Sequence, residues 1–359
     1  MNAEMIDKRI RAIRRDMGKR GINFLIVTKP ANVTYTTGFL GADSWAVITK
    51  GRVYFVTDSR YTEQAQKECT GCKIVERTDT LAGAVAKIAG KRKSAGTVAV
   101  ENSASLAWYE QLRKALKTRP KSVSGIIENI RSDKDGGEHA AIKTAAAIST
   151  KALAQTMPYI KPGVTESELA GMLDFQFRKL GAKNGFETIV AFGPNASRPH
   201  HQPGKRILRK RDSVLIDFGA EYKSYHSDLT RCFCIGKPTD FYRKVFDVVE
   251  QAQAAAISLI KDGADMIEVD AAARKVISEN NLPVYGHGSG HGIGLEIHEN
   301  PFLKPDGKGT LKAGQILTIE PGIYIPGKLG VRLEDDVLVT ETGHQIITSK
   351  CPHSPYEIG

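Results

Sequence analysis

The sequence contains no long run of apolar residues. No stretch approaches the roughly 18 consecutive apolar residues that a membrane-spanning helix needs, so we expect no membrane partner. The first residues, MNAEMIDKRIRAIRRDMGKRG, are typical of a polar helix and lack the apolar segment of a signal peptide. We therefore expect a cytoplasmic protein. The hydrophobic fraction of 41% and the charged fraction of 25% fit an ordinary globular chain.

Cysteine is scarce. An odd total of five, with no export signal, argues against a disulfide framework. Cys69 and Cys72 form a C-x-x-C pair, but no second pair follows at zinc-finger spacing, so metal or redox use is not favoured. Cys232 and Cys234 lie two apart in a predicted strand and would share a face as small packing residues.

Aromatic residues do not accompany the basic clusters of this chain, whose net charge is +11. Lys91-Arg92-Lys93 and Arg209-Lys210-Arg211 are short, and a nucleic-acid surface would interleave aromatic side chains with such clusters. Solvated loops are the favoured interpretation, and we expect no nucleic-acid partner.

The 359 residues divide into two predicted domains. Residues 1–130 mix strands such as NFLIV and WAVITKGRVYFVTD, with Lys50-Gly51 as a hairpin turn, and helices such as EQLRKALK. The boundary falls in LKTRPKSVSGIIENIRSDKDGGEH, which is rich in charge, Gly and Ser. Residues 131–359 form the second domain, which carries the candidate chemistry.

The second domain repeats its own pattern after about one hundred residues. Long helices are predicted at about 138–160 and 240–261. Each precedes a shorter helix, begun by Thr165 or Asp265 with a Glu three residues later. Each unit then reaches a pair of strands that carry two acidic residues. The pattern predicts an internal duplication with a site at the seam.

The first acidic pair lies in the hairpin SVLIDFGAEYKSYHSDLTRCFCI. With Tyr222-Lys223 as its turn, Asp217 stands directly opposite Asp228, at a Cβ separation of about 4.5–5.5 Å. Two bare carboxylates so placed repel each other, so the arrangement requires counter-charge, which metal ions supply.

The second acidic pair follows the same logic. A loop centred on Gly327 aligns Glu320 with Glu334. A single acid of this kind is more often an exposed strand residue in a salt bridge. Two opposed pairs in duplicated units make that alternative unfavourable.

An imidazole completes the candidate metal site. His291 lies in GSGHGIG, where glycines allow close backbone approach. A phosphate loop does not fit the glycine spacing, and Asp217-Phe218-Gly219 lacks the other kinase motifs. Four carboxylates and one His suit two divalent ions. Mn is favoured, and Co, Zn and Fe are the alternatives that bind the same kinds of ligand. Paired metals of this kind support hydrolysis.

These segments resemble the metallopeptidase family of methionine aminopeptidase, aminopeptidase P and prolidase. The matching segments are IDFGAEYKSYHSDLTR, GHGSGHGIGLEIHE, TIEPGIY and GVRLEDDVLVT. The resemblance implies an α+β architecture: a pita-bread catalytic domain with pseudo-twofold duplication, preceded by a smaller α/β creatinase-type N-terminal domain. That first domain, with the local match TYTTGF, and Arg332 favour the proline-directed branch.

The resemblance also implies a role for each metal-binding residue. Asp217 would bind one metal alone, and Asp228 and Glu334 would bridge the pair. His291 and Glu320 would complete the second ion. Glu320 would also accept the proton of the attacking water.

Further residues match family positions that line the substrate site. His298 would donate to the scissile carbonyl, and His200 and His287 would hold the substrate and its proline ring. Arg332 would orient the carboxylates that bind the metals, and the side chains of Tyr225 and Thr230 would do the same. His201 has no assigned role and is expected to be an exposed neighbour.

We expect a dinuclear-metal hydrolase that removes the residue before proline from small peptides, as aminopeptidase P does. An Xaa-Pro bond is a tertiary amide without an N–H, which general peptidases handle poorly. A prolidase, restricted to dipeptides, is the nearest alternative and would need a cationic group or a steric wall for the substrate carboxylate. A metal-free creatinase-like enzyme and a non-catalytic binding module are disfavoured by the complete ligand set. The resemblance also implies a homodimer.

Overall fold

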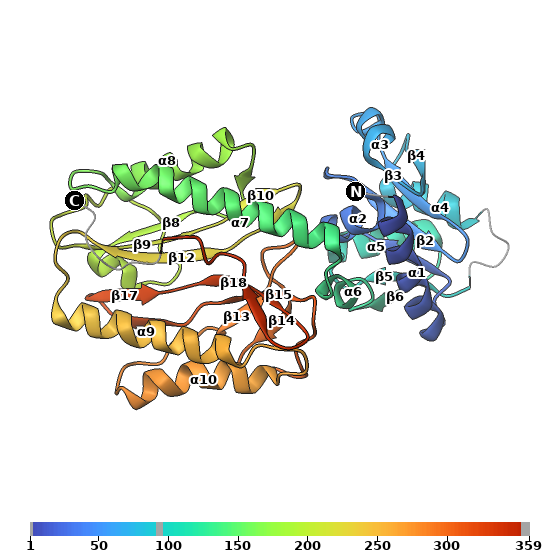
Figure 1. Cartoon of the computed structure of the whole chain (residues 1–359). Helices are drawn as coiled ribbons and strands as arrows, with labels where there is room; N and C mark the ends of the chain where they lie inside the picture. The colour runs from blue at the N-terminus through green and yellow to red at the C-terminus, as the bar shows by residue number, and fades with distance from the viewer. Residues whose placement is uncertain (1–2, 91–95, 353–359) are drawn as a thin grey trace. The chain divides into compact units, whose positions relative to one another are not determined.

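The computed structural model describes residues 3–90 and 96–352. The chain divides into two compact units at the Arg131–Ser132 junction (Figure 1). We call them the N-terminal unit and the C-terminal unit and describe each by itself. The predicted basic cluster Lys91-Arg92-Lys93 lies outside the described residues.

A six-stranded sheet forms the centre of the N-terminal unit, in the order β4-β3-β2-β1-β5-β6. The predicted Lys50-Gly51 hairpin is confirmed, because Ile48 pairs with Val53 across it. The strands are β1 (Phe24–Val27), β2 (Trp45–Thr49), β3 (Val53–Thr57), β4 (Cys72–Glu76), β5 (Val98–Glu101) and β6 (Lys121–Val123). The helices are α1 (Ala3–Lys19), α2 (Pro30–Thr37), α3 (Thr62–Glu68), α4 (Leu81–Gly90), α5 (Leu106–Leu116) and α6 (Glu128–Ser132).

A buried carboxylate accepts hydrogen bonds from the backbone at the start of helix α2 in this unit. Glu101, at the end of β5, accepts hydrogen bonds from the backbone N–H groups of Thr28 (2.6 Å) and Lys29 (2.9 Å) and from the Asn32 amide (2.6 Å). The first N–H groups of a helix have no partner within it, so a carboxylate at this end is stabilising. Burial nevertheless raises the pKa of Glu101 above its usual value.

The C-terminal unit contains two successive sets of helices and strands. The first set holds α7 (Gly136–Thr156), a 3₁₀ turn (Met157–Tyr159), α8 (Glu166–Lys179), β7 (Lys183–Asn184), β8 (Ile189–Phe192), β9 (Ser213–Phe218), β10 (Ala220–Tyr222), β11 (Tyr225–His226) and β12 (Leu229–Cys234). The second set holds α9 (Asp240–Ser258), α10 (Met266–Glu279), β13 (Gly290–Gly292), β14 (Glu299–Leu303), β15 (Ile316–Ile319), β16 (Gly322–Ile325), β17 (Leu329–Arg332), β18 (Asp335–Val339) and β19 (His344–Ile346).

The two sets correspond closely, as the predicted duplication requires. Helices α8 and α10 begin one hundred residues apart, at Glu166 and Met266. Thr165 caps the first in a complete capping box, and Asp265 caps the second by accepting from two backbone N–H groups. Each capping residue also forms an isolated antiparallel bridge, Thr165 with Ile207 and Asp265 with Thr310. The two equivalent sets of elements therefore bring their strands together along one seam of the C-terminal unit.

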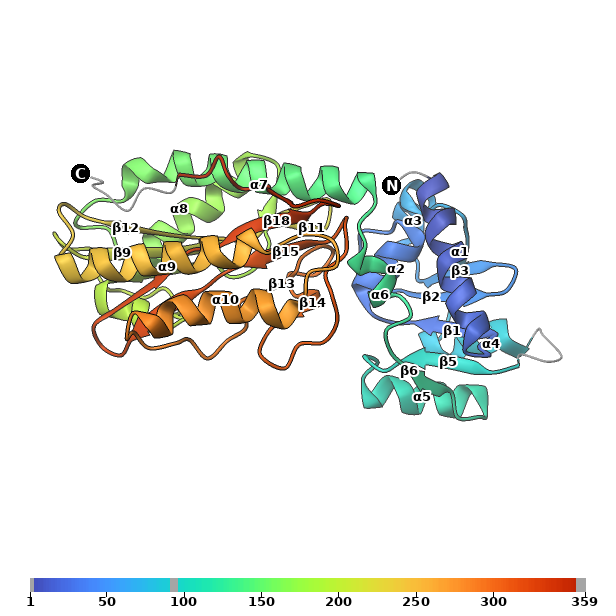
Figure 2. The ribbon, with the colours of Figure 1, turned by 60° about the horizontal axis from the view of Figure 1, so that its bottom comes forward.

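Helices cover both faces of the strands in this unit. Figures 1 and 2 show α7 and α8 along one face and α9 and α10 along the other. One apolar core lies against α9 and α10 and includes Val245, Val249 and Val337. A second lies against α7 and α8 and includes Leu153 and Phe177. This arrangement confirms the predicted α+β architecture.

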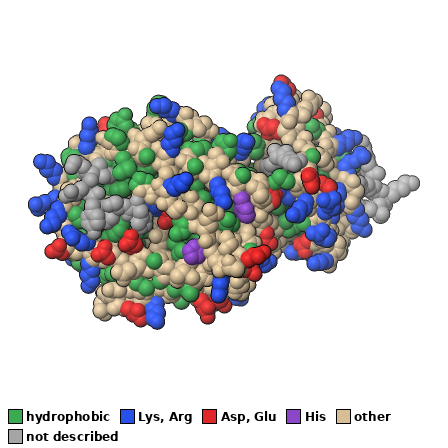
Figure 3. Space-filling view, viewed as in Figure 1, with side chains coloured by type: hydrophobic (Ala, Val, Ile, Leu, Met, Phe, Trp, Pro, Cys, Tyr) green, Lys and Arg blue, Asp and Glu red, His purple; other side chains and the backbone are tan. Residues whose placement is uncertain are grey.

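Several smaller predictions can be checked against the fold. Cys232 and Cys234 are buried in β12 and pack together in the core against α9 and α10, as predicted. Arg209, Lys210 and Arg211 are exposed in a turn, as expected for a solvated loop. On the face drawn in Figure 3, Lys and Arg side chains are interspersed with Asp and Glu. Among the described helices, none combines the length and the apolarity needed to cross a bilayer.

Candidate metal centre

One cavity of the C-terminal unit brings the predicted site residues together. Its volume of about 520 Å³ lies within the usual range for small-molecule sites. Its lining includes all nine residues predicted for metal binding or catalysis: His200, Asp217, Asp228, His287, His291, His298, Glu320, Arg332 and Glu334.

The first hairpin supplies Asp217 from β9 and Asp228 from the segment before β12. The predicted turn at Tyr222-Lys223 is wrong, because Tyr222 pairs with Tyr225 and the turn is formed by Lys223 and Ser224. Both turn residues have positive φ, 51° and 64°, the backbone of a type I′ hairpin turn. Asp217 therefore stands opposite Thr230 and not opposite Asp228. The two acids still line the same cavity, offset along the hairpin.

The second hairpin has the predicted register. Ile319 pairs with Asp335 on one side of the acidic pair, and Gly322 pairs with Arg332 on the other. Glu320 and Glu334 occupy the gap between these paired segments, so their alignment follows from the flanking strands. The loop tip contains Gly327 at φ 69°.

His291 lies close to acidic residues from both sets of helices and strands. A ligand atom from each of Asp228, His291 and Glu334 lies within 4.8 Å of the other two. The His291 Nε2 atom is 3.6 Å from Glu320 Oε1 and 3.7 Å from Asp228 Oδ2. The neighbouring Gly290 is required for packing, because a Cβ there would lie 1.9 Å from the Thr318 carbonyl oxygen.

Among the described lining residues, a single Lys or Arg side chain, Arg332, stands beside four carboxylates. Burial is the largest cause that raises the pKa of Asp228, Glu334, Glu320 and Asp217. Repulsion by neighbouring acids adds to it at Asp228, Glu334 and Glu320, whereas Arg332 opposes it at Asp217, Glu320 and Glu334. The pKa of Glu320 rises to about 8. A positive charge placed among these groups would reverse each of these shifts.

Two carboxylate oxygens provide an independent test of whether cations fit. Asp217 Oδ1 and Asp228 Oδ1 are buried and have no hydrogen-bond partner among the described residues. Buried polar atoms are nearly always paired, so unpaired oxygens that face several other carboxylates are unusual. Together with a neutral imidazole they make an oxygen-rich donor set of the kind that divalent transition metals bind. The residues present therefore fit the predicted metal pair.

Burial keeps the two innermost histidines neutral. Desolvation is the largest cause that lowers the pKa of His291 to about 4, and the nearby His298 ring contributes. Desolvation likewise lowers the pKa of His287 to about 4. A neutral imidazole has the free nitrogen lone pair that a metal ligand requires.

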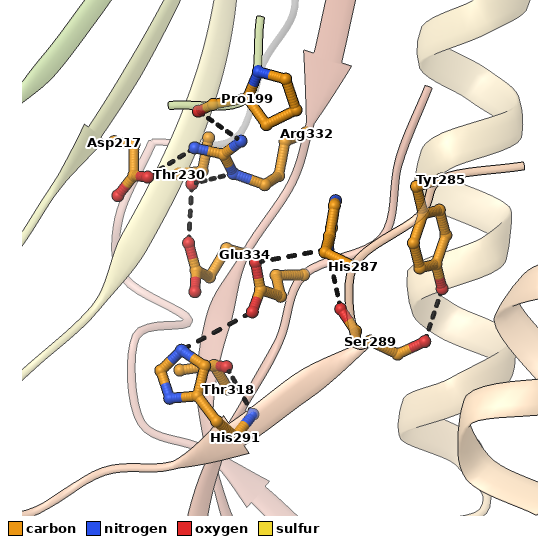
Figure 4. Close-up of polar contacts among 12 residues, drawn as sticks. Pro199, Asp217, Thr230, Tyr285, His287, Ser289, His291, Thr318, Arg332 and Glu334 are labelled. Atoms are coloured by element: carbon orange, nitrogen blue, oxygen red, sulfur yellow. Dashed lines mark hydrogen bonds and ion pairs between the residues drawn. The ribbon is translucent and has the colours of Figure 1, made fainter. Parts of the chain in front are cut away.

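Arg332 connects the two acidic pairs from behind (Figure 4). Its guanidinium donates to Asp217 Oδ2, to Thr230 Oγ1 at 2.9 Å and to the Tyr324 hydroxyl at 3.0 Å. The Thr230 hydroxyl in turn donates to Glu334 Oε2 at 2.6 Å. Arg332 and Thr230 thus lie where they would orient metal-ligating carboxylates.

Tyr225 does not share that position. Its hydroxyl donates over 3.1 Å to Glu138, the capping-box residue at the start of α7. This bond directs the Tyr225 hydroxyl to α7, and an orienting role of Tyr225 toward the ligands stays a prediction.

The three remaining histidines lie at different depths of the cavity. The His298 ring packs edge-on against His291, with centroids 4.3 Å apart. His287 stacks on Tyr285 at 4.7 Å, and its Nε2 lies 3.1 Å from the Tyr324 hydroxyl. His200 is exposed at the rim.

His201 differs from its prediction as an exposed neighbour. Its side chain is buried, and its Nε2 lies 2.9 Å from Glu166 Oε2. Glu166 also accepts from the backbone N–H groups of Phe192 and Gly204. His201 therefore anchors the loop that carries His200. A loop has no regular alternation of buried and exposed side chains, so the burial of His201 could not be predicted from the sequence.

Several residues of the site were not predicted. Tyr324 contacts both His287 and Arg332 and lies four residues after Glu320, so strand alternation would have placed the two on one face. Asp270 binds Arg274 and the Ser289 hydroxyl, and its i,i+4 spacing to Arg274 on α10 was a visible signal.

Comparisons with known proteins agree with this geometry. Residues 140–341 match the model of the metallopeptidase family M24, and residues 9–132 match the creatinase/prolidase N-terminal domain. An uncharacterized peptidase of Bacillus subtilis, YqhT, is 36% identical over 356 residues, which cover 98% of this chain and 99% of that protein.

Solved structures show the same likeness. An Xaa-Pro dipeptidase from Bacillus anthracis is 35% identical with a TM-score of 0.92, covering 98% of this chain and 99% of that one. An X-Pro aminopeptidase from Thermotoga maritima is 32% identical with a TM-score of 0.87, covering 96% and 99%. The predicted pita-bread domain behind a creatinase-type N-terminal domain is confirmed. The chain is a metallopeptidase of the prolidase and aminopeptidase P kind, and it belongs to family M24.

Proposed function

We propose that this enzyme hydrolyses Xaa-Pro bonds and that Xaa-Pro dipeptides are its principal substrates. The observation that carries the proposal is the full-length likeness to the Bacillus anthracis structure described as an Xaa-Pro dipeptidase. Prolidases from Pyrococcus horikoshii and Thermococcus sibiricus are also similar over nearly the whole chain. The aminopeptidase P reading that the sequence first favoured becomes the second candidate.

The residues that would hold the cations are Asp217, Asp228, His291, Glu320 and Glu334, the set that surrounds the unpaired carboxylate oxygens. We propose two divalent ions there, with manganese favoured. When bound, such a pair activates water and polarises a carbonyl group. Cation binding would also leave all four acids ionised and neutralise their repulsion.

The protein side chains would supply proton transfer and orientation. Glu320 is the most exposed of the four acids and borders the cavity, so its carboxylate would accept the proton of the attacking water. His298 lies beside His291 and would donate from its ring N–H to the substrate carbonyl oxygen. His287 and the rim His200 line the same cavity and would hold the substrate.

Apolar side chains in the same cavity would accept the proline ring. Phe186, Ile297 and Phe302 line it together with the histidines. Proline offers no N–H for recognition, so a site for an Xaa-Pro bond must select the ring by shape and apolar contact. This lining fits that requirement.

A second candidate function, removal of the first residue from longer peptides, is favoured by one feature of the cavity. Among its described lining residues, Arg332 is the only Lys or Arg, and it is buried and engaged with Asp217, Thr230 and Tyr324. A dipeptide carboxylate would thus find no uncommitted Lys or Arg among the described lining residues. The Thermotoga maritima X-Pro aminopeptidase is almost as similar as the dipeptidase.

Cleavage of matched substrates separates these candidates. Release of alanine is measured from Ala-Pro and Ala-Pro-Ala, with chelator and with added Mn²⁺, and Ala-Ala serves as the control. Turnover of Ala-Pro alone supports the dipeptidase, and comparable turnover of Ala-Pro-Ala supports the aminopeptidase. Absence of turnover of every peptide with any divalent metal would remove the enzymatic proposal and leave the non-catalytic module. The homodimer stays a prediction.

A further inference from the structure

Helix α10 carries a buried ion pair that has no role in the proposed hydrolysis as described so far. Asp270 is 1% exposed, and Arg274 lies one turn further along the same helix. The Arg274 guanidinium donates from Nε to Asp270 Oδ2 at 2.7 Å and from a terminal nitrogen to Asp270 Oδ1 at 3.0 Å. Paired bonds of this kind fix the geometry of both side chains.

The carboxylate of this pair is connected to Glu320 through one residue. Asp270 Oδ1 accepts from the Ser289 hydroxyl at 2.6 Å and from the Ser289 backbone N–H at 3.2 Å. The Ser289 carbonyl accepts from the Glu320 backbone N–H at 2.9 Å. Two hydrogen-bonded steps therefore join Asp270 to the backbone of the proposed proton acceptor.

The guanidinium of the pair is connected to His287. Arg274 donates to the Tyr285 carbonyl at 2.8 Å and to the His287 carbonyl at 2.6 Å. Its Cζ lies 4.4 Å from the centroid of the Tyr285 ring, which stacks on the His287 ring at 4.7 Å. Figure 4 shows the Tyr285 hydroxyl directed at Ser289, whose Oγ is 2.5 Å away. Both the backbone and the ring of His287 are therefore held from α10.

A second ion pair on α10 provides a contrast. Lys275 and Glu279 lie 3.8 Å apart, and 74% and 63% of their side chains are exposed. Exposed pairs of this kind contribute little to stability. Asp270 and Arg274 instead direct their hydrogen bonds to the segment that carries His287, so the two pairs of one helix have different uses.

We propose that Asp270 and Arg274 are positioning residues for the hydrolysis. Asp270 fixes Glu320 through Ser289. Arg274 fixes the ring of His287. The inference rests on the proposed function, because it concerns the proton acceptor and a histidine that holds the substrate. Residues behind a metal site typically change metal affinity or activity about 10–100-fold when they are replaced, because the groups they hold lose their alignment.

Kinetics with Ala-Pro separates the two branches. Arg274→Ala should raise KM about 10–100-fold with a smaller change in kcat, because His287 no longer holds the substrate in place. Asp270→Ala should mainly lower kcat, because Glu320 is displaced. Asp270→Asn keeps an oxygen acceptor for Ser289 and should recover most of that loss. Partial unfolding would lower kcat alone, since it reduces the active fraction without changing KM.

Glu279→Gln is the matched control. It removes the acid of the exposed pair on the same helix and should leave both kinetic constants at their parental values.

Hydrogen exchange of the metal-free, full-length chain tests the same contacts without catalysis. In Asp270→Ala, peptides that contain Ser289 and Glu320 should exchange faster than in the parent, since both N–H groups belong to this hydrogen-bonded connection. Peptides of β9 and β12 should keep the parental rate, which shows that the fold is intact. Uptake of Mn²⁺ by the same variant should weaken about 10–100-fold.

The possible failures are distinguishable. The inference is overturned if Arg274→Ala keeps the parental KM, or if a folded Asp270→Ala keeps the parental kcat. A parent protein that cleaves no peptide would instead contradict the proposed function. In that case exchange and Mn²⁺ uptake decide the inference: faster exchange at Ser289 and Glu320 with weaker uptake in Asp270→Ala supports it, and parental values overturn it.

Discussion

Buried carboxylates in the two units of this protein differ in how completely their oxygens are hydrogen bonded. In the N-terminal unit, both oxygens of Glu101 accept hydrogen bonds, from two backbone N–H groups and the Asn32 amide. In the C-terminal unit, Asp217 and Asp228 each keep one buried oxygen with no hydrogen-bond partner among the described residues. Burial raises the pKa in both places.

The difference separates a structural carboxylate from one that is built to bind. A carboxylate that stabilises a fold is saturated by donors, because an unpaired buried oxygen costs free energy. Asp217 and Asp228 bear that cost beside Glu320 and Glu334, and the proposed cations would offset it. Hydrogen-bond saturation therefore distinguishes the two uses better than burial or pKa does.

The largest expected effect comes from removing one charge of the second group. Asp228→Asn should reduce hydrolysis by more than the roughly 10–100-fold typical of residues behind a metal ligand, and it should lower bound manganese. The metal-free variant should melt at a higher temperature than the metal-free parent, because one repelling charge is gone. Kinetics, metal analysis and calorimetry check these outcomes, and full activity with normal metal content would contradict the bridging role.

A third kind of buried acid sharpens the comparison. Glu299 is paired with Lys134 at 2.6 Å, and both side chains are almost fully buried. Lys134→Met should lower the free energy of unfolding by about 3–5 kcal/mol, because Glu299 loses its cationic partner in the interior.

The double variant Lys134→Met with Glu299→Leu serves as the control for that prediction. It should recover most of the loss, since well-packed apolar replacements of a buried ion pair are often neutral. Urea unfolding measures all three proteins. A loss below about 1 kcal/mol in the single variant would show that the pair behaves like an exposed one.

Glu101→Gln breaks the saturated side of the comparison. An amide cannot accept all of the donors that the carboxylate accepts, so we expect a loss of about 1–3 kcal/mol of unfolding free energy. Bound manganese and hydrolysis should match the parent protein, in contrast to Asp228→Asn. A loss of metal in this variant would contradict the separation of the two groups.

The smallest predicted effect is a pH dependence of the metal-free protein. The pKa of Glu320 is about 8 in the folded chain, above the usual carboxyl value, so between those values the folded state holds a proton that the unfolded state lacks. Stability should therefore fall as pH rises toward 8. His287 and His291, with pKa values of about 4, have the opposite effect below their usual pKa of about 6.5.

The useful range for that measurement is therefore between about pH 6.5 and about pH 8, where the histidines no longer titrate. Chelator-treated protein is unfolded by urea at points across it. Adding Mn²⁺ at neutral pH should release protons, because ligating carboxylates must be ionised. A metal-free protein that gains stability across this range would contradict the raised pKa of Glu320.

The sequence predicted one hairpin correctly and the other incorrectly, for a physical reason. The loop around Gly327 contains a residue suited to positive φ, which marks its centre and so fixes the register of Glu320 and Glu334. The other turn consists of Lys223 and Ser224, two residues that rarely adopt positive φ. No local pattern identified that turn, so the predicted turn was one position too early and the predicted partner of Asp217 was two residues from the observed one, Thr230.

Residue types and spacing predicted the acidic pairs and His291, and the family resemblance added His200, His287, His298 and Arg332; all of them line the cavity. Long-range partners were not predicted, because they depend on how elements far apart in sequence pack together. The contacts of His201 with Glu166 and of Lys134 with Glu299 join residues 35 and 165 positions apart. Among the contacts around the cavity that are discussed above, the Asp270–Arg274 and Glu320–Tyr324 spacings were the ones that a short stretch of sequence could indicate.

Because the C-terminal unit is duplicated, each of its two halves supplies part of the candidate metal centre. Asp217 and Asp228 come from one half and His291, Glu320 and Glu334 from the other, and the Thr230–Glu334 and Asp228–Asp336 hydrogen bonds join them. A chain cut at the Lys237-Pro238 link would give two fragments, each with an incomplete ligand set. Recovery of tight cation uptake on mixing would then report that the halves had reassembled, which makes the enzyme a candidate for split-protein complementation.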